Sequence, residues 1–169
     1  MKMTEFLLDE LEREAERSKR ALEEVPEGKH DWKPHDKSMI FGYLAEMVAR
    51  IPSWVAMAVT KDEFDINPPG GSQYKMGPLN TSAELTAELE KCTEQARFAL
   101  KGTTDEFLKT PWKLLVAGKV VMELPRHVVI SDALNHLVHH RGQMTVYLRL
   151  MGSKVPALYG PSADDPRFA

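Results

Sequence analysis

Histidines 136, 139 and 140 are the residues of this sequence whose type and spacing best suit chemistry. They lie in the stretch NHLVHHRGQ at positions 135–143. Residues four apart on a helix stack on one face, so His136 and His140 can present imidazole nitrogens to the same point in space. A catalytic zinc ion usually needs three protein ligands, however. The pair therefore suits a metal site and equally suits two histidines that hydrogen-bond to neighbours at the margin of a core.

A helical projection predicts which of these histidines face inward. The pattern predicts a helix over about 125–151, and each residue of a helix advances by about 100°. With His136 at zero, His140 falls at about +40°, Gln143 at about −20° and His139 at about −60°. The apolar set of this helix is centred near +100° and comprises Ile130, Ala133, Leu134, Leu137, Met144 and Leu148. We therefore expect His136 and His140 at the shoulder of the buried stripe and His139 in solvent.

Three further helices must position this segment. Amphipathic spacing predicts helices over 3–25, from about 39 to 60, and over about 25 residues from the NTSAEL stretch. Pro52 should bend the second of these helices because it has no N–H and its ring crowds the preceding turn. Residues 62–80 contain three prolines and three glycines and are predicted to form a long irregular loop. The stretch WKLLVAGKVVMELP predicts a hairpin.

These elements together predict an all-α protein, a four-helix bundle with a small β-hairpin before the last helix. The 169 residues are enough for one well-buried core and are expected to form a single domain, 1–169. The tail after the last helix is irregular, and Tyr159 and Phe168 are expected to dock on the helices.

Composition excludes several classes of partner. The formal net charge of −3 provides no overall positive field for a nucleic acid. Cys92 is the only cysteine, so no internal disulfide can form. No apolar run approaches the roughly 20 residues needed to span a bilayer, and the N-terminal stretch is charged from its start. We therefore expect a cytoplasmic protein with neither a membrane nor a nucleic acid as its partner.

Two longer stretches resemble a known family. They are WKPHDKSMIFGYLAEMVARIPSW at 32–54 and LNHLVHHRGQMTVYLRLMGSKVPALYGPSAD at 134–164, and both are similar to the DinB/YfiT-like family of small four-helix-bundle proteins. The resemblance implies a homodimer and a divalent metal, often nickel or zinc, held by three histidines. Two of these correspond to His136 and His140. Known members include thiol transferases and isomerases that use low-molecular-weight thiols, so the resemblance also implies a small-molecule or thiol ligand.

The third family histidine is missing from this sequence. Its position in the second helix falls on Met47, whose thioether is a soft ligand that suits Cu(I) better than Zn²⁺ or Ni²⁺. Met47 also lies on the apolar stripe of that helix, where a methionine most simply fills the core. Tyr43 and Arg50 are predicted on the flank of the site, and Arg50 would favour an anionic ligand over a metal. The candidate pocket therefore comprises Tyr43, Met47, Arg50 and Gln143.

Other donors could replace the missing imidazole. Glu46 suits a divalent ion chemically but should point away from the stripe, about 100° from Met47. His35, in the loop before the second helix, and the acidic residues of 62–65 remain alternatives that the sequence cannot place. Gly142 is unfavourable in mid-helix by up to about 1 kcal/mol and predicts the close approach of another helix, as at a dimer interface.

Two functional hypotheses follow. In the first, a histidine-lined cavity between the second and last helices binds nickel or zinc for thiol transfer or metal-assisted hydrolysis. In the second, the protein is a non-catalytic small-molecule-binding or structural dimeric module that has lost its metal site through Met47. No catalytic residue can be named from the sequence alone.

Overall fold

The computed structural model describes residues 1–71 and 77–167, and these residues form six helices and a three-stranded sheet. The predicted, mainly helical class is confirmed at this level. The number of helices differs from the prediction because the second helix is divided and a short one precedes the sheet. The elements in chain order are α1 (Met3–Glu23), α2 (Phe41–Arg50), α3 (Pro52–Thr60), β1 (Glu63–Asp65), α4 (Ser82–Lys101), α5 (Asp105–Leu108), β2 (Pro111–Val116), β3 (Lys119–Pro125) and α6 (Arg126–Leu150).

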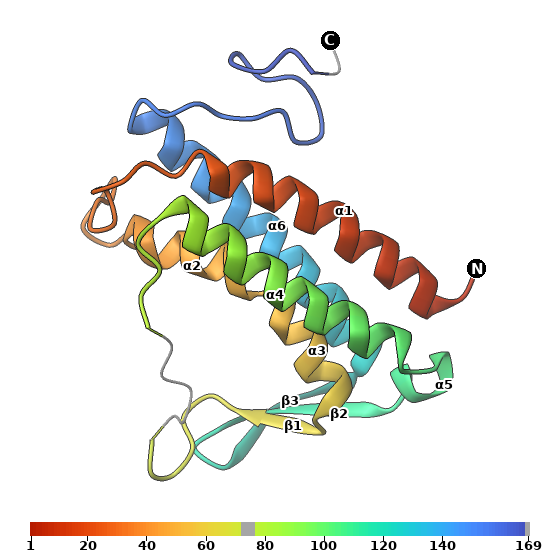
Figure 1. Cartoon of the computed structure of the whole chain (residues 1–169). Helices are drawn as coiled ribbons and strands as arrows, with labels where there is room; N and C mark the ends of the chain where they lie inside the picture. Colours follow the sequence, from red (N-terminus) through yellow and green to blue (C-terminus); the bar gives the residue numbers. More distant parts are fainter. Residues whose placement is uncertain (72–76, 168–169) are drawn as a thin grey trace.

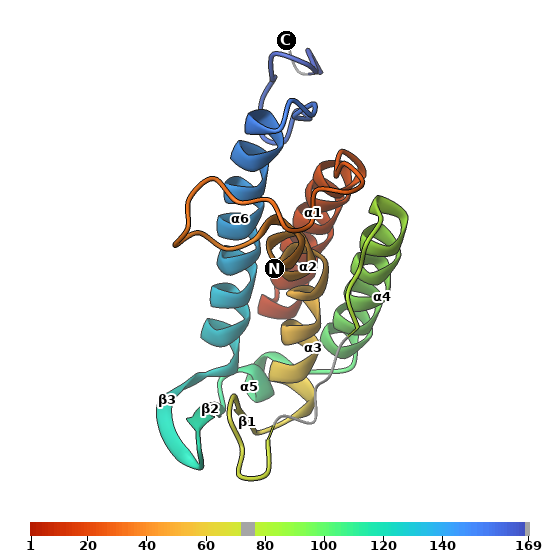
Figure 2. The same cartoon turned by 90° about the vertical axis from the view of Figure 1, so that its left-hand side faces the viewer.

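The long helices lie side by side with the sheet at one end (Figures 1 and 2). Helix α1 contacts α4 and α6, and the α2 and α3 pair contacts the same two helices from another side. Two apolar clusters fill the space between them, one around Phe41, Leu44 and Leu137 and the other around Leu11 and Val55. Among the described residues, no helix combines the length and apolar character that a membrane crossing requires.

Pro52 divides the predicted second helix into α2 and α3. The N–H of Ile51 still donates to the carbonyl of Met47, at 3.0 Å, and ends α2. Pro52 has no N–H to continue this ladder but suits the first turn of a new helix, where that N–H has no partner. The predicted bend is thus confirmed as a break, and it sets the direction in which α3 presents Trp54.

The predicted hairpin is confirmed as β2 and β3, joined by Ala117 and Gly118. Both turn residues have positive φ, 50° and 77°, as a two-residue hairpin turn requires. Asp65 accepts hydrogen bonds from both of their N–H groups, at 3.0 and 2.7 Å. The prediction that 62–80 is irregular throughout is therefore wrong for β1, which pairs in parallel with β2. A three-residue strand is too short to show a period, and its partner lies about fifty residues away.

Three further sequence predictions differ from the structure or lie outside the described residues. Helix α4 has 20 residues, not about 25, and ends at Lys101, directly before Gly102. A Cβ added at Gly142 would meet nothing within 4 Å, so no other helix of residues 1–71 and 77–167 approaches it closely. An approach by a second copy of the chain stays a prediction. Phe168, expected to dock with the tail, lies outside the described residues.

Candidate functional site

The histidine pair of α6 is brought together as its spacing predicts. The Nε2 atoms of His136 and His140 are 2.7 Å apart, which is a hydrogen-bond distance. The two residues differ in burial, because His140 is only 6% exposed while His136 lies on the exposed side of the helix. The helical projection placed both histidines at the edge of the buried stripe. In the structure, His140 is buried within this stripe and His136 is exposed beside it.

Gln143, one turn beyond His140, determines where the proton of that imidazole resides. The Nδ1 atom of His140 lies 2.8 Å from Oε1 of Gln143. An amide oxygen can only accept, so Nδ1–H of His140 is the donor. In the neutral imidazole, Nε2 then carries a lone pair, and Nε2–H of His136 donates to it. Gln143 thus keeps a ligand-competent nitrogen of His140 directed toward His136.

Two aromatic rings surround the pair. The indole of Trp54, from α3, meets the His136 ring edge-on with the ring centroids 5.2 Å apart. His139 is exposed, as predicted, with its ring centroid 5.2 Å from that of His140. Trp54 is half-buried and packs against both apolar clusters. Its indole is therefore fixed in position where it contacts the His136 ring.

The electrostatics of the site favour a neutral His136. Although His136 lies on the exposed side of α6, partial desolvation of its ring is the main cause that lowers its pKa below the ordinary value, and the neighbouring His140 and His139 add to the effect. A lowered pKa keeps the imidazole uncharged near neutral pH, which is the form that binds metal ions. The pair can therefore offer nitrogen lone pairs to a cation or exchange a proton with a bound molecule.

Met47 and Tyr43 occupy different environments on α2. Met47 is half-buried and packs against the apolar cluster around Phe41 and Leu44. This position agrees with its interpretation as a core-filling residue. Tyr43 is 51% exposed, so its side chain lies at the surface of the same helix.

Arg50 is held on the side of α2 that faces α4. Its Nη1 donates to Glu46 at 2.7 Å, and its Nη2 donates to the carbonyl of Gly77 at 2.6 Å. Glu88 of α4 lies 3.9 Å from its Nε. Glu46 also accepts from the N–H of Leu79. The charge of Arg50 is thus neutralised by the carboxylates of Glu46 and Glu88. Glu46 is itself occupied by Arg50 and by the N–H of Leu79.

The alternative donors have partners of their own. Nδ1 of His35 accepts from the N–H of Lys37. Asp62 forms an ion pair with Arg126 at 2.5 Å, and Asp65 caps the hairpin turn. These contacts engage His35, Asp62 and Asp65 within the fold.

The histidine pair matches a divalent metal in part. Tetrahedral zinc with bonds of about 2.0 Å requires its ligand nitrogens about 3.3 Å apart, so the two Nε2 atoms would separate by about 0.6 Å on binding. The two atoms are in direct hydrogen-bond contact, so a metal would have to displace the proton between them. Within 1–71 and 77–167, moreover, no group of three or more histidine, cysteine or acidic side chains could hold a metal. Two histidine nitrogens are present, and the position at which the family resemblance implies a third histidine is occupied by Met47.

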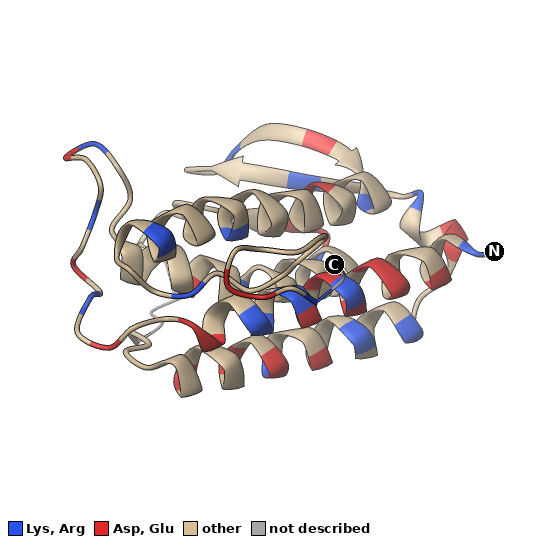
Figure 3. Cartoon of the chain, turned by 90° about the horizontal axis from the view of Figure 1, so that it is seen from above, with Lys and Arg blue, Asp and Glu red and all other residues tan. Residues whose placement is uncertain are grey.

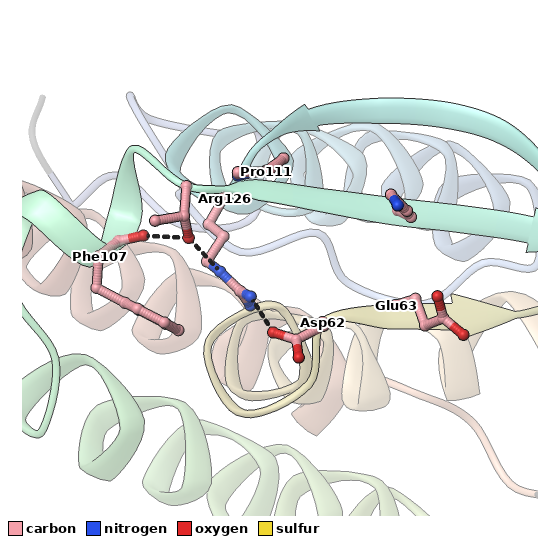
Figure 4. A pocket seen from close by; sticks show the side chains of 7 residues that line it. Asp62, Glu63, Phe107, Pro111 and Arg126 are labelled. Atoms are coloured by element: carbon pink, nitrogen blue, oxygen red, sulfur yellow. Dashed lines mark hydrogen bonds and ion pairs between the residues drawn. The ribbon is translucent and has the colours of Figure 1, made fainter.

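A hollow of about 350 Å³ lies elsewhere, between β1, β2 and α5 (Figure 4). Its floor is Arg126, which is 2% exposed and lies 4.4 Å from the centre of the Phe107 ring. Its guanidinium donates to the carbonyls of Ala58 and Lys61, to Thr110 and to Asp62. With these partners, Arg126 joins α3 and α6 to the residues that precede β1 and β2.

Sequence reasoning missed one buried charge close to the histidines. Arg141 is 1% exposed and forms an ion pair with Glu14 of α1 at 2.5 Å. The signal was present in the helical projection, because Arg141 falls at about +140°, within the arc of apolar residues. A charged residue at such an angle implies a buried partner.

The fold and the sequence resemble proteins already known. A DinB-like protein from Bacillus cereus ATCC 10987 superposes with a TM-score of 0.70 and 23% identity, over 92% of this chain and 97% of that one. The DinB-like protein YjoA from Bacillus subtilis gives a TM-score of 0.66 at 18% identity, over 88% and 94% of the two chains. At these identities the similarity shows the fold alone.

A curated relative is the uncharacterized protein YrdA of Bacillus subtilis strain 168, which is 40% identical over 92 residues. The match covers 52% of this chain and 51% of YrdA, so it spans about half the length of that relative. The model of the DinB family matches residues 1–167. Because this match extends over nearly the whole sequence, the chain belongs to the DinB family.

Proposed function

We propose that His136 and His140 bind one divalent metal ion, nickel or zinc, and that the remaining ligands are water or a small molecule such as a low-molecular-weight thiol. The observation that carries this proposal is the convergence of the two Nε2 atoms at 2.7 Å. When bound, such an ion would lower the pKa of a thiol or water ligand and make it a nucleophile, as thiol transfer or hydrolysis requires.

The surrounding residues support this use of the pair. Gln143 fixes the tautomer and orientation of His140, as outer partners of metal-binding histidines commonly do. Trp54 restricts the His136 ring from one side. Because partial desolvation lowers the pKa of His136, its imidazole is neutral at neutral pH, and a move of its proton from Nε2 to Nδ1 would make Nε2 available as a ligand.

A second candidate is a non-catalytic binding module. Met47 favours it, because its side chain packs with the apolar core and its thioether is a poor ligand for nickel or zinc. In this case the His136 and His140 pair would be a hydrogen-bonded unit that holds a small molecule or stabilises the surface of α6.

A second copy of the chain is the proposed partner. Between Ala133 and Leu148, Arg141 is the only charged residue of α6, and it is buried against α1. Figure 3 shows acidic and basic residues along α1 and α4 and a largely uncharged α6. Val146 and Leu150 are 57% and 59% exposed on this helix. A face poor in charge with exposed apolar side chains is typical of a protein interface.

Metal analysis tests the proposed function. The protein is purified without an affinity tag, dialysed against nickel or zinc, and compared with His140→Ala and His139→Ala. We expect about one ion per chain in the wild type and in His139→Ala, and less than a tenth of an ion in His140→Ala. Wild-type protein that retains less than a tenth of an ion would instead support the non-catalytic module.

Met47→His provides the complementary test. A third imidazole on α2 should tighten binding if the pair and Met47 line the same site, because catalytic zinc sites commonly use three protein ligands. Unchanged affinity in this variant would show that Met47 lies outside the metal site.

A further inference from the structure

A second hollow, of about 200 Å³, lies between the C-terminal end of α1 and the segment that follows α6, residues 153–167. Figure 1 shows this segment at the end of the bundle where α1 ends. The hollow is smaller than the roughly 300–1,000 Å³ of sites for drug-sized molecules, so it suits a ligand of few non-hydrogen atoms. Seven of its nine lining residues are charged, three of them basic and four acidic.

Arg20 brings a guanidinium N–H without an acceptor to this hollow. Its side chain is only 14% exposed, and its Nε is buried with no hydrogen-bond partner in the described part of the chain. Its ion pair with the exposed Glu16 spans 3.9 Å, which is longer than a hydrogen bond. Arg17, one turn earlier, instead donates to Glu14 and to the carbonyl of Leu158. Because burial of an N–H without an acceptor is costly, Arg20 is a donor that a ligand could satisfy.

The two aspartates of the lining have other partners. Asp164 is paired with Arg149 at 2.5 Å. Asp165 accepts hydrogen bonds from two backbone N–H groups, both at 3.1 Å. These two bonds lower the pKa of Asp165, and the charge of Arg20 adds to the effect. Arg20 therefore lies close enough to act on Asp165 electrostatically, yet it forms no salt bridge with either aspartate.

Glu23 and Glu24 supply negative charge one turn after Arg20. Residues three and four apart share one face of a helix, yet neither glutamate forms a salt bridge with Arg20 or with another described residue. Both lie at the C-terminal end of α1, where the helix dipole disfavours carboxylates and favours a cation. The hollow thus presents a guanidinium N–H without an acceptor beside two carboxylates without a cation.

We propose that this hollow binds a small zwitterion, an α-amino acid. Its carboxylate accepts from Arg20, and its ammonium group lies by Glu23 and Glu24 at the end of α1. A guanidinium suits a carboxylate because its planar N–H groups can donate two parallel bonds. The hollow shares no lining residue with the histidine pair, so the inference does not depend on a bound metal.

Three small probes test this assignment in metal-free protein, followed by ¹H–¹⁵N NMR at the Nε–H of Arg20. L-Alanine carries both charges, whereas acetate and methylammonium carry one each. We expect L-alanine, at up to about 50 mM, to shift the Arg20 signal saturably and to bind about tenfold more tightly than either other probe. Equal affinity for L-alanine and acetate, or no saturable shift with L-alanine, would overturn the proposal.

Arg20→Gln identifies the carboxylate-binding group, with Arg13→Gln as the matched control. Arg13 is on the same helix, pairs with Glu10 and does not line the hollow. Binding in both variants is followed at the backbone N–H of Val155, which does line it. L-Alanine binding should weaken about tenfold in Arg20→Gln and stay unchanged in Arg13→Gln. Equal effects of the two substitutions would contradict the role of Arg20.

The double variant Glu23→Gln with Glu24→Gln tests the ammonium end of the ligand. These side chains lie at the end of α1 without ion pairs, so the variant should fold and keeps the test decisive even if Arg20→Gln does not fold. Its affinity for L-alanine should fall to that of the wild type for acetate. Wild-type affinity for L-alanine in this variant would overturn the assignment of a zwitterion.

Discussion

Replacing Glu14 by glutamine should cost about 3 kcal/mol of unfolding free energy. Glutamine keeps the shape and one acceptor oxygen but removes the charge that faces Arg141. The carboxylate accepts from Arg141, from Tyr159 and from Arg17. Each such bond is about 1 kcal/mol stronger with an ionised acceptor, and breaking a buried ion pair costs about 3–5 kcal/mol in other proteins.

The assay is urea unfolding monitored by far-UV circular dichroism, with Glu16→Gln as the control. Glu16 is on the same helix but exposed, 3.9 Å from Arg20, so its substitution should change the unfolding free energy by less than about 0.5 kcal/mol. The double variant Glu14→Gln with Arg141→Met should be more stable than the sum of the single effects, because it leaves no buried charge unpaired. A Glu14→Gln variant within about 0.5 kcal/mol of the wild type would refute the reasoning.

The same residue predicts an acid dependence. The pKa of Glu14 is lowered from an ordinary value of 4.5, so the unfolded state binds more protons in this range. Its stabilising contribution is complete above about pH 4.5 and is lost as the pH falls through its folded-state pKa. Glu14→Gln should therefore show a shallower loss of stability on acidification, measured by urea unfolding between pH 6 and pH 3. An equal slope in both proteins would contradict the lowered pKa.

Three further predictions concern other parts of the chain. Gly142→Ala should raise the unfolding free energy by up to about 1 kcal/mol at low protein concentration, because alanine favours a helix and the added Cβ meets no atom within 4 Å. A lower unfolding free energy in urea would contradict this. Asp65→Ala should lower the unfolding free energy by about 1–2 kcal/mol, because the N–H groups of Ala117 and Gly118 lose their acceptor. Hydrogen exchange at these two amides should become faster, and unchanged exchange would argue against the role of Asp65. Cys92 should react with a thiol reagent only on unfolding, since burial and Glu88 raise its pKa to about 11; rapid reaction in the folded protein would refute this.

The sequence predicts the long elements well because their patterns are periodic. Helix α6 is predicted over about 125–151 and found at Arg126–Leu150, and the break at Pro52 follows from the missing N–H. Strand β1 is not predicted, because three residues are too few to show the alternating pattern of a strand and its partner β2 lies about fifty residues away. Local patterns thus determine the helices and the β2–β3 hairpin, while the pairing of β1 depends on a long-range contact that only the folded chain reveals.

The candidate site is predicted in part for a related reason. The i, i+4 spacing correctly brings His136 and His140 together, because helix geometry fixes their separation. The exposure of His136 and the orientation of Arg50 toward α4 depend on how neighbouring helices pack, which one sequence does not determine. The partners of Arg141 are Glu14 of α1 and Tyr159 of the segment that follows α6, more than a hundred residues apart in the sequence.

Crystals soaked in nickel offer the most direct test of the account, through anomalous diffraction at the nickel absorption edge. The account predicts one strong anomalous peak per chain, within about 2.2 Å of the Nε2 atoms of both His136 and His140, with the remaining coordination positions filled by water or buffer. It also predicts no such peak in His140→Ala crystals. An anomalous map without a peak at the pair, or with nickel bound at other residues, would contradict the claim that these two histidines form a metal site.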